Sequence, residues 1–396
     1  MIDQASDKNA VKQRPKVLVM ADWYTPGFRA GGPIRSVANF AAQLETDLDI
    51  YVLTTDRDLG MLHPYPDVRP NEWISLQHHQ VCYLSPDRLS WRSITGIIQR
   101  LRPDHIYLNS MFSRYMTIYP LLYRRLGGTH ARVLLAPRGM LMASALAVKP
   151  WRKRIFLALL RTAGIGNIIH FQATNDEEAG DVTRTFGDQA RVIRLGNLPA
   201  PVATFLPPAD KQSGMLKMVF IGRAHPIKQL DYLLGVLEQV RQQIALTVIM
   251  TREDDAYADL CRRQAASLPG NITVQFLEDV PHEDITDIIL SNHIFALPTR
   301  GENFGHSIYE ALAAGRPVLV SDQTPWRRLT AMKAGWDLSL KEPDIFRQCI
   351  EEAAAWDLDE LLEWSRGAWH LAKSTVEDRP DRKNYITQFS SCISLD

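Results

Sequence analysis

Two glutamates stand close together in one short segment of the chain, RGENFGHSIYEALAAGRPVLVSD, which covers residues 300–322. Glu302 precedes a predicted helix, whereas Glu310 lies inside it. Asn303 can cap this helix, and the unpaired amides of its first turn attract anions. In a fully helical segment, a rise of ~1.5 Å per residue would separate the carboxylates by about 12 Å. This span suits an extended ligand with hydroxyl groups at both ends and an anionic group between them.

A nucleoside diphosphate sugar has that layout, with ribose, pyrophosphate and sugar in line. The alternative is a solvated helix with two surface glutamates. We favour the binding site because Glu310 is embedded in the apolar run SIYEALAAG, where a bare charge would be costly.

Two cations follow a predicted strand that precedes this segment in the chain. Arg223 ends the strand MVFIGR, and Lys228 precedes the next helix. Two cations at the mouth of a cleft can bind a diphosphate and stabilise it as it leaves. Without the glutamate segment, Arg223 and Lys228 would be interpreted as ordinary exposed bases. Together with the glutamate segment they favour a site for a diphosphate.

Two further loops carry candidate donor-site residues. Gly31 and Gly32 precede a helix in the loop ADWYTPGFRAGGPIRS and would let the backbone approach a phosphate closely. The loop lacks the GxGxxG pattern, so a dinucleotide cofactor is not supported. Pro33 replaces the lysine that a P-loop requires. Arg138, in APRGML, could contact donor phosphate or acceptor, or serve a structural purpose.

The elements that must position these loops alternate along the chain. Apolar runs without strict alternation, separated by helical patterns, predict parallel strands covered on both faces and therefore an α/β fold. The pattern breaks in a stretch rich in proline and then restarts. We therefore expect two Rossmann-like domains that face a cleft, with ligands at the carboxyl ends of the strands. The predicted boundaries are an N-terminal domain at 1–200 joined by 375–396, a linker at 201–215, and a C-terminal domain at 216–374.

Bulk composition narrows the class of protein. The chain has 396 residues, 45% of them hydrophobic, and a formal net charge of zero, so no global field favours nucleic acid. The cysteines are far apart and form no CxxC pair, which indicates reduced thiols in the cytoplasm rather than a zinc site. The polar N-terminus does not resemble a signal peptide. No apolar run is long enough to cross a membrane. The four cysteines that are far apart in the sequence are Cys82, Cys261, Cys349 and Cys392.

The order of these motifs resembles the retaining glycosyltransferases of family 4, which have the GT-B fold. The resemblance rests on Arg223 with Lys228, and on Glu302-x7-Glu310 followed by AAGRPVLVSD. Family members that build bacterial surface polysaccharides, such as exopolysaccharide or lipopolysaccharide, have segments similar to four stretches of this chain. These stretches are the Gly-Gly loop, APRGML, ATNDEE and TPW. The resemblance covers nearly the whole chain.

The resemblance implies transfer of a hexose-type sugar from a nucleotide sugar to a glycan or lipid-linked acceptor, with retention and without a metal or other cofactor. In the family, the glutamate matching Glu310 holds the ribose hydroxyls, and the one matching Glu302 contacts the donor sugar. Arg223 and Lys228 match the pair that stabilises the leaving diphosphate. The amides near Asn303, Phe304 and Gly305 approach sugar and phosphate. The chain differs from many members in carrying Arg138 in place of a histidine and Glu278 in place of a glycine.

Three other interpretations stay open. A metal-dependent transferase would use an Asp-x-Asp motif, which occurs at Asp47-x-Asp49, Asp56-x-Asp58 and Asp357-x-Asp359. A nucleotide-sugar epimerase on the same fold would convert its substrate without an acceptor. A sensor that only binds nucleotide sugars would not need Arg223, Lys228 and Glu302 together.

Contact with a membrane surface is a separate prediction for residues 149–161. The run VKPWRKRIFLALLR joins tryptophan and several bases, including Lys149, to an apolar helix face. This composition suits an anionic bilayer, at the inner face of the plasma membrane for a cytoplasmic protein. We expect the apolar residues themselves to pack on the sheet, with the basic residues facing outward.

Overall fold

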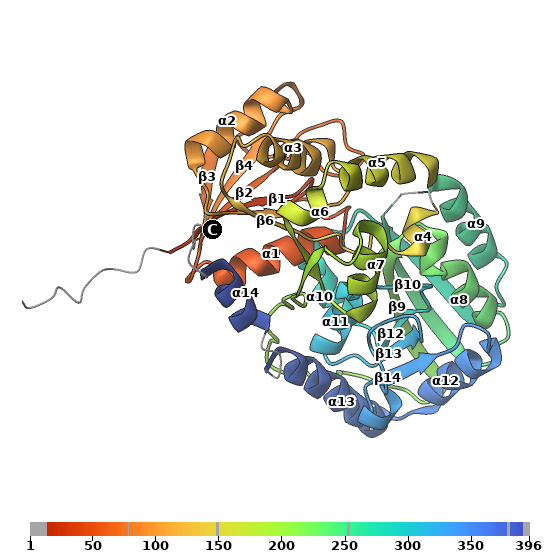
Figure 1. Ribbon diagram of the computed structural model, residues 1–396. Coiled ribbons are helices and arrows are strands. Elements are labelled where there is room, and N and C mark those ends of the chain that lie inside the picture. Colours follow the sequence, from red (N-terminus) through yellow and green to blue (C-terminus); the bar gives the residue numbers. More distant parts are fainter. Residues whose placement is uncertain (1–13, 78, 148–149, 252–253, 378–380, 391–396) are drawn as a thin grey trace, which may run out of the picture.

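The structure is a computed structural model, and it describes residues 14–77, 79–147, 150–251, 254–377 and 381–390. Within these ranges the chain forms two β-sheets, each covered by helices (Figure 1). The prediction of an α/β fold with two Rossmann-like domains is confirmed. No helix among the described residues is both long enough and apolar enough to cross a bilayer.

The first sheet has eight strands in the order β3-β4-β2-β1-β5-β6-β7-β8. All neighbours are parallel except β3 and β4, which pair antiparallel at the edge of the sheet. The apolar-run pattern did not reveal β3, because this edge strand is only partly buried. The strands are β1 (Lys16–Met20), β2 (Asp49–Thr55), β3 (Trp73–Leu76), β4 (His79–Leu84), β5 (His105–Leu108), β6 (Arg132–Leu135), β7 (His170–Ala173) and β8 (Arg191–Arg194).

Helices cover both faces of this sheet. Residues of α1 pack on one face, in a core with Val19 and Val52, while α2, α3 and α5 share a second core with Leu18 and Leu108 on the other face. The helices are α1 (Gly32–Leu44), α2 (Trp91–Leu101), α3 (Tyr119–Arg125), α4 (Ala143–Leu146), α5 (Pro150–Thr162), α6 (Ile165–Ile168) and α7 (Asp176–Phe186).

The second sheet has six strands, all parallel, in the order β11-β10-β9-β12-β13-β14. The strands are β9 (Met215–Arg223), β10 (Gln243–Thr251), β11 (Ile272–Glu278), β12 (Ile294–Leu297), β13 (Val318–Ser321) and β14 (Gly335–Leu338). The helices are α8 (Leu230–Leu237), α9 (Asp255–Ala266), α10 (His282–Leu290), α11 (His306–Ala313), α12 (Pro343–Ala355) and α13 (Leu358–Glu377).

A buried arginine ties the connecting segment to the second sheet. Arg316 is 1% exposed and donates to the backbone oxygens of Leu290 and Asn292 at 2.7 and 2.8 Å. It also donates to the backbone oxygen of Leu206, in the irregular stretch between β8 and β9. Several backbone carbonyls thus satisfy one buried charge, which its burial otherwise makes costly.

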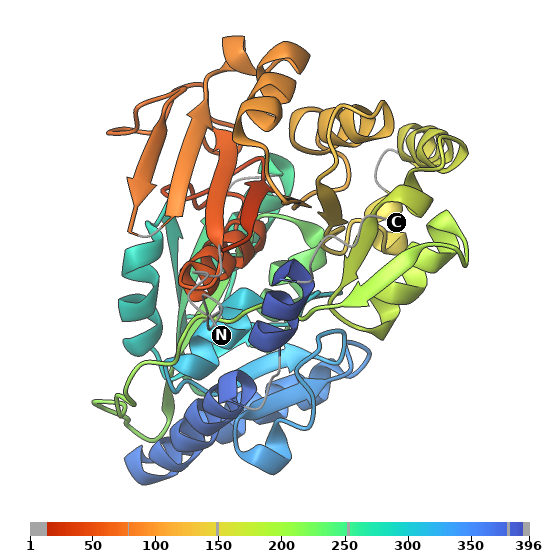
Figure 2. The same cartoon turned by 60° about the vertical axis from the view of Figure 1, so that its left-hand side comes forward.

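The chain crosses back to the first sheet at its C-terminal end. Helix α14 (Asp381–Ser390) lies against α1, whereas α13 lies along the second domain (Figures 1 and 2). Tyr385 and Phe389 are buried in the core that contains Phe40. The Asp381 carboxylate accepts a hydrogen bond from the amide of Gly196 at 2.9 Å. Residues 391–396, which include Cys392, lie outside the described ranges.

Candidate active site

The second sheet brings two of the predicted residues, Lys228 and Glu302, together at its switch point. Strands β9 and β12 are neighbours in the sheet although β10 and β11 lie between them in the sequence. Their carboxyl-end loops are therefore adjacent, which is where open α/β sheets bind ligands. The amide of Arg300 donates to the backbone oxygen of Ile227 at 2.7 Å and so joins the two loops.

Lys228 and Glu302 meet across this junction. The Lys228 Nζ donates to Glu302 Oε1, and the two side chains are only 15% and 13% exposed. Arg223 is the last residue of β9 and lies in register with Thr251 of β10. The sequence predicted Lys228 and Glu302 as separate contacts to diphosphate and sugar. The structure places them in direct contact with each other.

Helix α11 begins at His306, but its cap differs from the one that the sequence suggested. Asn303 does not cap it: the N-cap is Gly305, with φ 77° and ψ 64°, a left-handed conformation that favours glycine. A Cβ at Gly305 would also lie 2.9 Å from Ile308 Cδ1. Phe304 is buried, and its backbone oxygen accepts a hydrogen bond from Trp326 Nε1 at 2.6 Å. Glu302 therefore lies in the loop, and the fully helical spacing to Glu310 does not apply.

Glu310 faces the other domain from within α11. Its Oε1 lies 3.7 Å from Arg35 Nε of α1 and 3.8 Å from His282 Nε2 of α10. Burial raises the pKa of Glu310 to about 7, although the Arg35 charge lowers it. Burial lowers the pKa of His282 to about 4, so this imidazole is neutral near pH 7.

The Gly-Gly loop lies opposite the first turn of α11. Gly31 is the N-cap of α1 with φ 64° and ψ −123°, a conformation suited to glycine. A Cβ added at Gly32 would lie 3.3 Å from His306 Cδ2. The Ser36 hydroxyl and His306 Nε2 are 2.8 Å apart and share a hydrogen bond. The N-terminal ends of α1 and α11 thus meet between the domains (Figure 1).

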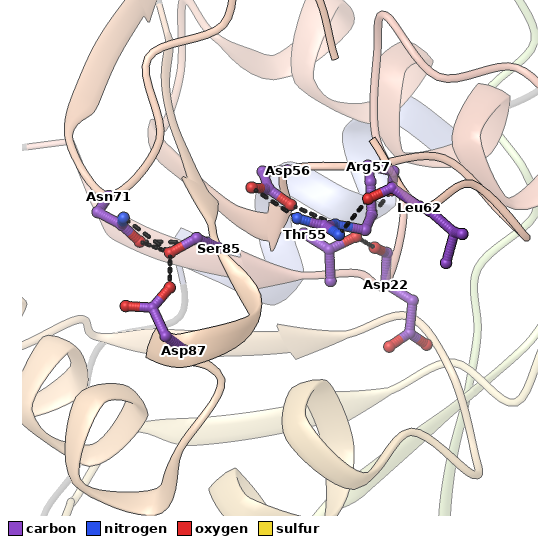
Figure 3. Close-up of polar contacts among 8 residues, drawn as sticks. All are labelled: Asp22, Thr55, Asp56, Arg57, Leu62, Asn71, Ser85 and Asp87. Carbon is purple, nitrogen blue, oxygen red and sulfur yellow. Dashed lines mark hydrogen bonds and ion pairs between the residues drawn. The ribbon is translucent and has the colours of Figure 1, made fainter. Parts of the chain in front are cut away.

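Aspartates after β2 stabilise neighbouring loops. Asp56 pairs with Arg57, whose guanidinium donates to the backbone oxygen of Leu62 at 2.6 Å (Figure 3). Asp58 accepts from the amides of Phe28 and Arg29 at 2.7 and 3.0 Å and so fixes the Gly-Gly loop. Among the described residues, no group of three or more His, Cys, Asp or Glu side chains is placed to hold a metal ion.

Arg138 points into the first domain. It has φ 56°, and its guanidinium donates to Tyr107 Oη at 2.8 Å and to Asn109 Oδ1 at 2.7 Å. It also donates to Asn197 Oδ1. These contacts join loops that follow β5, β6 and β8. Its Nε is buried and lacks a hydrogen-bond partner in the structure. The next residue, Gly139, lies beside Asn303.

Some residues near the domain boundary were given no site role from the sequence, although one of its motifs contains them. Glu178 is 3% exposed and accepts from the amides of Gly139 and Thr174. The Thr174 hydroxyl lies 2.6 Å from Asn303 Oδ1 across the domain boundary. Both residues belong to the ATNDEE stretch, whose asparagine caps α7 and was the available signal.

Asp22 was also missed, although it directly follows the first strand. Its Oδ1 accepts a hydrogen bond from Ser113 at 2.5 Å, and its backbone oxygen accepts one from Thr55 at 2.6 Å. Its carboxylate points away from the Asp56–Arg57 pair (Figure 3). Burial raises the pKa of Asp22, against the lowering effect of the serine hydroxyls. A carboxylate at the end of a buried strand was the signal that could have found it.

Part of the chain matches a known family. Residues 206–337 match the family model described as "Glycosyl transferases group 1". A D-inositol 3-phosphate glycosyltransferase of Kribbella flavida is 25% identical over 170 residues, 38% of this chain and 39% of that protein. The enzyme of the same name from Rhodococcus erythropolis is 28% identical over 167 residues, 38% of this chain and 37% of its own length. The matching segment thus spans less than two fifths of these relatives.

Solved structures match over nearly the entire chain. Anabaena Alr3699/HepE in complex with UDP and glucose has a TM-score of 0.68 at 15% identity, covering 96% of this chain and all of that one. Sucrose-phosphate synthase from Thermosynechococcus elongatus has a TM-score of 0.69 at 14% identity, with the same coverage. WaaG, a glycosyltransferase involved in lipopolysaccharide biosynthesis, has a TM-score of 0.65 at 12% identity, covering 95% of this chain and all of WaaG. The chain therefore has the GT-B fold.

Proposed function

We propose that this GT-B protein is a retaining glycosyltransferase that moves a hexose-type sugar from a nucleoside diphosphate sugar to an acceptor hydroxyl. The observation that carries the proposal is the Lys228–Glu302 contact beside the N-terminal end of α11. In this proposal, the cation at the switch point of the second sheet binds phosphate and the carboxylate beside it binds sugar hydroxyls. The match of residues 206–337 to glycosyl transferases group 1 supports the same activity.

The donor would extend from Glu310 toward Glu302. Glu310 accepts the ribose hydroxyls, and the unpaired amides at the start of α11 receive the diphosphate. Arg223 and Lys228 neutralise the charge that grows on the diphosphate as the glycosidic bond breaks. Gly31 and Gly32 bring the backbone of α1 close to the phosphates. We place UDP first among the candidate nucleotides because Alr3699/HepE is a UDP complex and shares this fold.

In this proposal, retention of the anomeric configuration follows from the role given to Glu302. Glu302 is paired with Lys228 and is therefore held for binding rather than for attack on the anomeric carbon. The acceptor oxygen bonds to the anomeric carbon on the face that the diphosphate leaves. Its proton passes to a departing phosphate oxygen. Two cations and a helix N-terminus offset the charge, so a metal is not required by this mechanism.

In this proposal, Arg138 contacts the acceptor or holds the part of the first domain that does. Its guanidinium is committed to Tyr107, Asn109 and Asn197. We infer that it shapes the first-domain wall of the cleft and that Gly139, beside Asn303, approaches the donor. The acceptor we propose is a glycan or a lipid-linked sugar of bacterial surface polysaccharide synthesis.

Helix α5 supports contact with a membrane surface. Trp151, Ile155 and Leu159 are 63%, 54% and 62% exposed and share one helix face at i, i+4 and i+8. Arg152 and Arg154 lie on opposite sides of this apolar stripe, and both are exposed. The expectation that the apolar residues of α5 pack inward is wrong for these three and right for Leu157 and Leu160.

Apolar residues flanked by arginines suit the boundary of an anionic bilayer, at the cytoplasmic face of the plasma membrane. Lys153 is used differently, because its Nζ donates to the backbone oxygen of Ala145 at 2.7 Å. Lys149 lies outside the described residues. We propose that α5 turns the cleft toward a lipid-linked acceptor.

A thermal-shift screen with UDP-, GDP-, ADP- and TDP-sugars tests the donor site. We expect one nucleotide class to raise the melting temperature, because a ligand that binds the folded state stabilises it by mass action. Glu310→Ala should abolish that shift. Incubation of the same donor without acceptor should leave the sugar configuration unchanged, which separates a transferase from an epimerase. No shift with any of these donors would contradict the proposal.

A further inference from the structure

An arginine of the first domain reaches the carboxylate that the proposed function assigns to the ribose. Arg35 belongs to the first turns of α1, which begins at Gly32, and its Nε lies 3.7 Å from Glu310 Oε1 of α11. The two side chains are 24% and 21% exposed, so the pair lies at the closed boundary between the domains. This inference rests on the proposed function, in which Glu310 binds the donor.

One nitrogen of the Arg35 guanidinium, Nε, is not satisfied where it lies. This nitrogen is buried and lacks a hydrogen-bond partner in the structure, because 3.7 Å is an ion-pair distance but too long for a hydrogen bond. Burial lowers the pKa of Arg35, while the Glu310 carboxylate raises it. An arginine that is buried and only partly paired costs free energy. Such a residue suits a site whose remaining partner is a ligand.

The groups around Glu310 leave Arg35 as its main positive neighbour. His282 of α10 lies 3.8 Å away but is neutral near pH 7, because burial and Arg35 lower its pKa to about 4. His306, on the same helix as Glu310, is also neutral, with its pKa lowered to about 3 by burial. Among the described residues, the ion pairs of Glu310 are those with Arg35 and His282.

Two tyrosines complete the surroundings. Tyr309 precedes Glu310 in α11, and Tyr24 of the β1–α1 loop interacts electrostatically with Arg35. Burial raises the pKa of each phenol above its ordinary value, so both are neutral at pH 6–9. Neither supplies a charge that could replace Arg35 beside Glu310.

Arg35 therefore sets the charge of Glu310 when the domains are closed. Closure removes water from Glu310, which favours the protonated carboxyl, whereas a guanidinium beside it favours the carboxylate. An ionised carboxylate makes stronger hydrogen bonds to ribose hydroxyls than a neutral carboxyl. We propose that Arg35 is a donor-site positioning residue supplied by the first domain, which favours the ionised form of Glu310 and so couples domain closure to retention of the nucleotide.

A purely structural bridge between the domains would behave differently. It would change donor affinity to the same extent at every pH. The electrostatic proposal predicts that the affinity lost with Arg35 returns at high pH, where Glu310 ionises without help. The pH profile therefore separates the two.

The experiment measures UDP-glucose binding by isothermal titration calorimetry from pH 6 to pH 9. In the wild type, affinity should rise through about pH 7 as Glu310 loses its proton. For a Glu310 pKa raised by about one unit, Arg35→Gln should weaken binding about fivefold at pH 7 and about tenfold at pH 6, and binding should recover at pH 9. Arg35→Lys should remain close to the wild type. Arg263→Gln, at an exposed arginine of α9, is the matched control and should change nothing.

A second measurement does not depend on the ligand. In protein labelled with 13C at the glutamate side-chain carboxyl, the Glu310 signal is identified by its loss in Glu310→Gln. Its titration midpoint should move to higher pH in Arg35→Gln and stay in place in Arg263→Gln. An unmoved midpoint overturns the proposal for Arg35, whether or not UDP-glucose binds.

The two proposals can fail separately. If Glu310→Gln abolishes binding of UDP-glucose while Arg35→Gln binds equally well at every pH, the donor site stands and the role of Arg35 is wrong. If Arg35→Gln moves the Glu310 titration but UDP-glucose binds wild type and Glu310→Gln alike, the electrostatic coupling stands and the ribose assignment is wrong.

Discussion

The two domains of this protein have the same architecture but are completed in different ways. The second sheet is entirely parallel, and Lys228 and Glu302 follow two of its strands on segments that a backbone hydrogen bond joins. The first sheet adds an antiparallel edge strand and depends on a helix, α14, from the far end of the chain. Its cleft residues come from loops after several strands.

The two halves of the proposed site differ in how far apart in the sequence their contacting segments lie. In the second domain, Lys228 and Glu302 follow two strands that are neighbours in the sheet, so short motifs carry the chemistry. In the first domain, Arg138 contacts Tyr107 of β5 and also Asn109 and Asn197, which belong to other loops. The proposed donor side can therefore be recognised from motifs, whereas the proposed acceptor side takes shape only when distant segments pack together.

The largest expected effect tests the dependence of the first domain on α14. Phe389 is 1% exposed and packs against Phe40 and His105. Phe389→Ala should reduce the free energy of unfolding of the first domain by about 3–5 kcal/mol, because it leaves a cavity. Hydrogen exchange of peptides from each sheet should show lost protection in the first sheet.

The matched control is Phe346→Ala, at a fully buried phenylalanine of α12 in the second domain. It should reduce protection of the second sheet instead. Equal loss of protection from exchange in both sheets with Phe389→Ala would show that the two domains unfold as one unit. That result would contradict the special dependence of the first domain on α14.

The next effect tests whether the donor half carries the chemistry. Lys228→Ala and Arg223→Ala should each lower turnover by roughly 100-fold or more, equivalent to about 2.7 kcal/mol, because each removes a charge that stabilises the leaving diphosphate. Release of nucleoside diphosphate from the donor found in the screen provides the measurement.

Lys217→Ala provides the control, since this lysine lies on β9, the strand that ends at Arg223, and pairs with Asp210 at 2.8 Å. Its turnover should match that of the wild type. Unchanged turnover in both Lys228→Ala and Arg223→Ala would contradict the assignment of the donor half.

The smallest effect concerns the outer surface of the first domain. Arg154→Gln should weaken binding to anionic phosphatidylglycerol vesicles by about 1 kcal/mol, roughly fivefold, because it removes one charge near the lipid surface. Arg263→Gln in the second domain should bind as the wild type does. Flotation at low and high salt checks both, since screening should abolish the difference. If the wild type does not bind at any salt concentration, the membrane proposal for α5 is wrong.

Much of the fold followed from local sequence. Apolar runs predicted strands at 16–22, 50–56, 105–110, 131–139 and 168–175, which overlap β1, β2, β5, β6 and β7, and at 217–223, 245–251, 272–279, 294–299 and 317–322, which overlap β9 to β13. They missed β3, β4, β8 and β14; of these, β3 is an edge strand that is only partly buried. The sequence singled out Lys228, Glu302 and Glu310 as candidates, and for Glu310 the signal was a carboxylate in an apolar helix. Arg35 was not singled out, because nothing local distinguishes it from other basic residues on a helix.

The sequence by itself determined where strands and helices form and which loops carry charge, because periodicity, glycine and helix-capping chemistry act over a few residues. The tertiary structure decided the partners: Lys228 with Glu302, Arg35 beside Glu310, and Arg138 inside the first domain. These pairs depend on the order of strands in each sheet and on how closely the domains pack. Burial, which raises the pKa of Glu310 to about 7, likewise exists only once two distant helices meet.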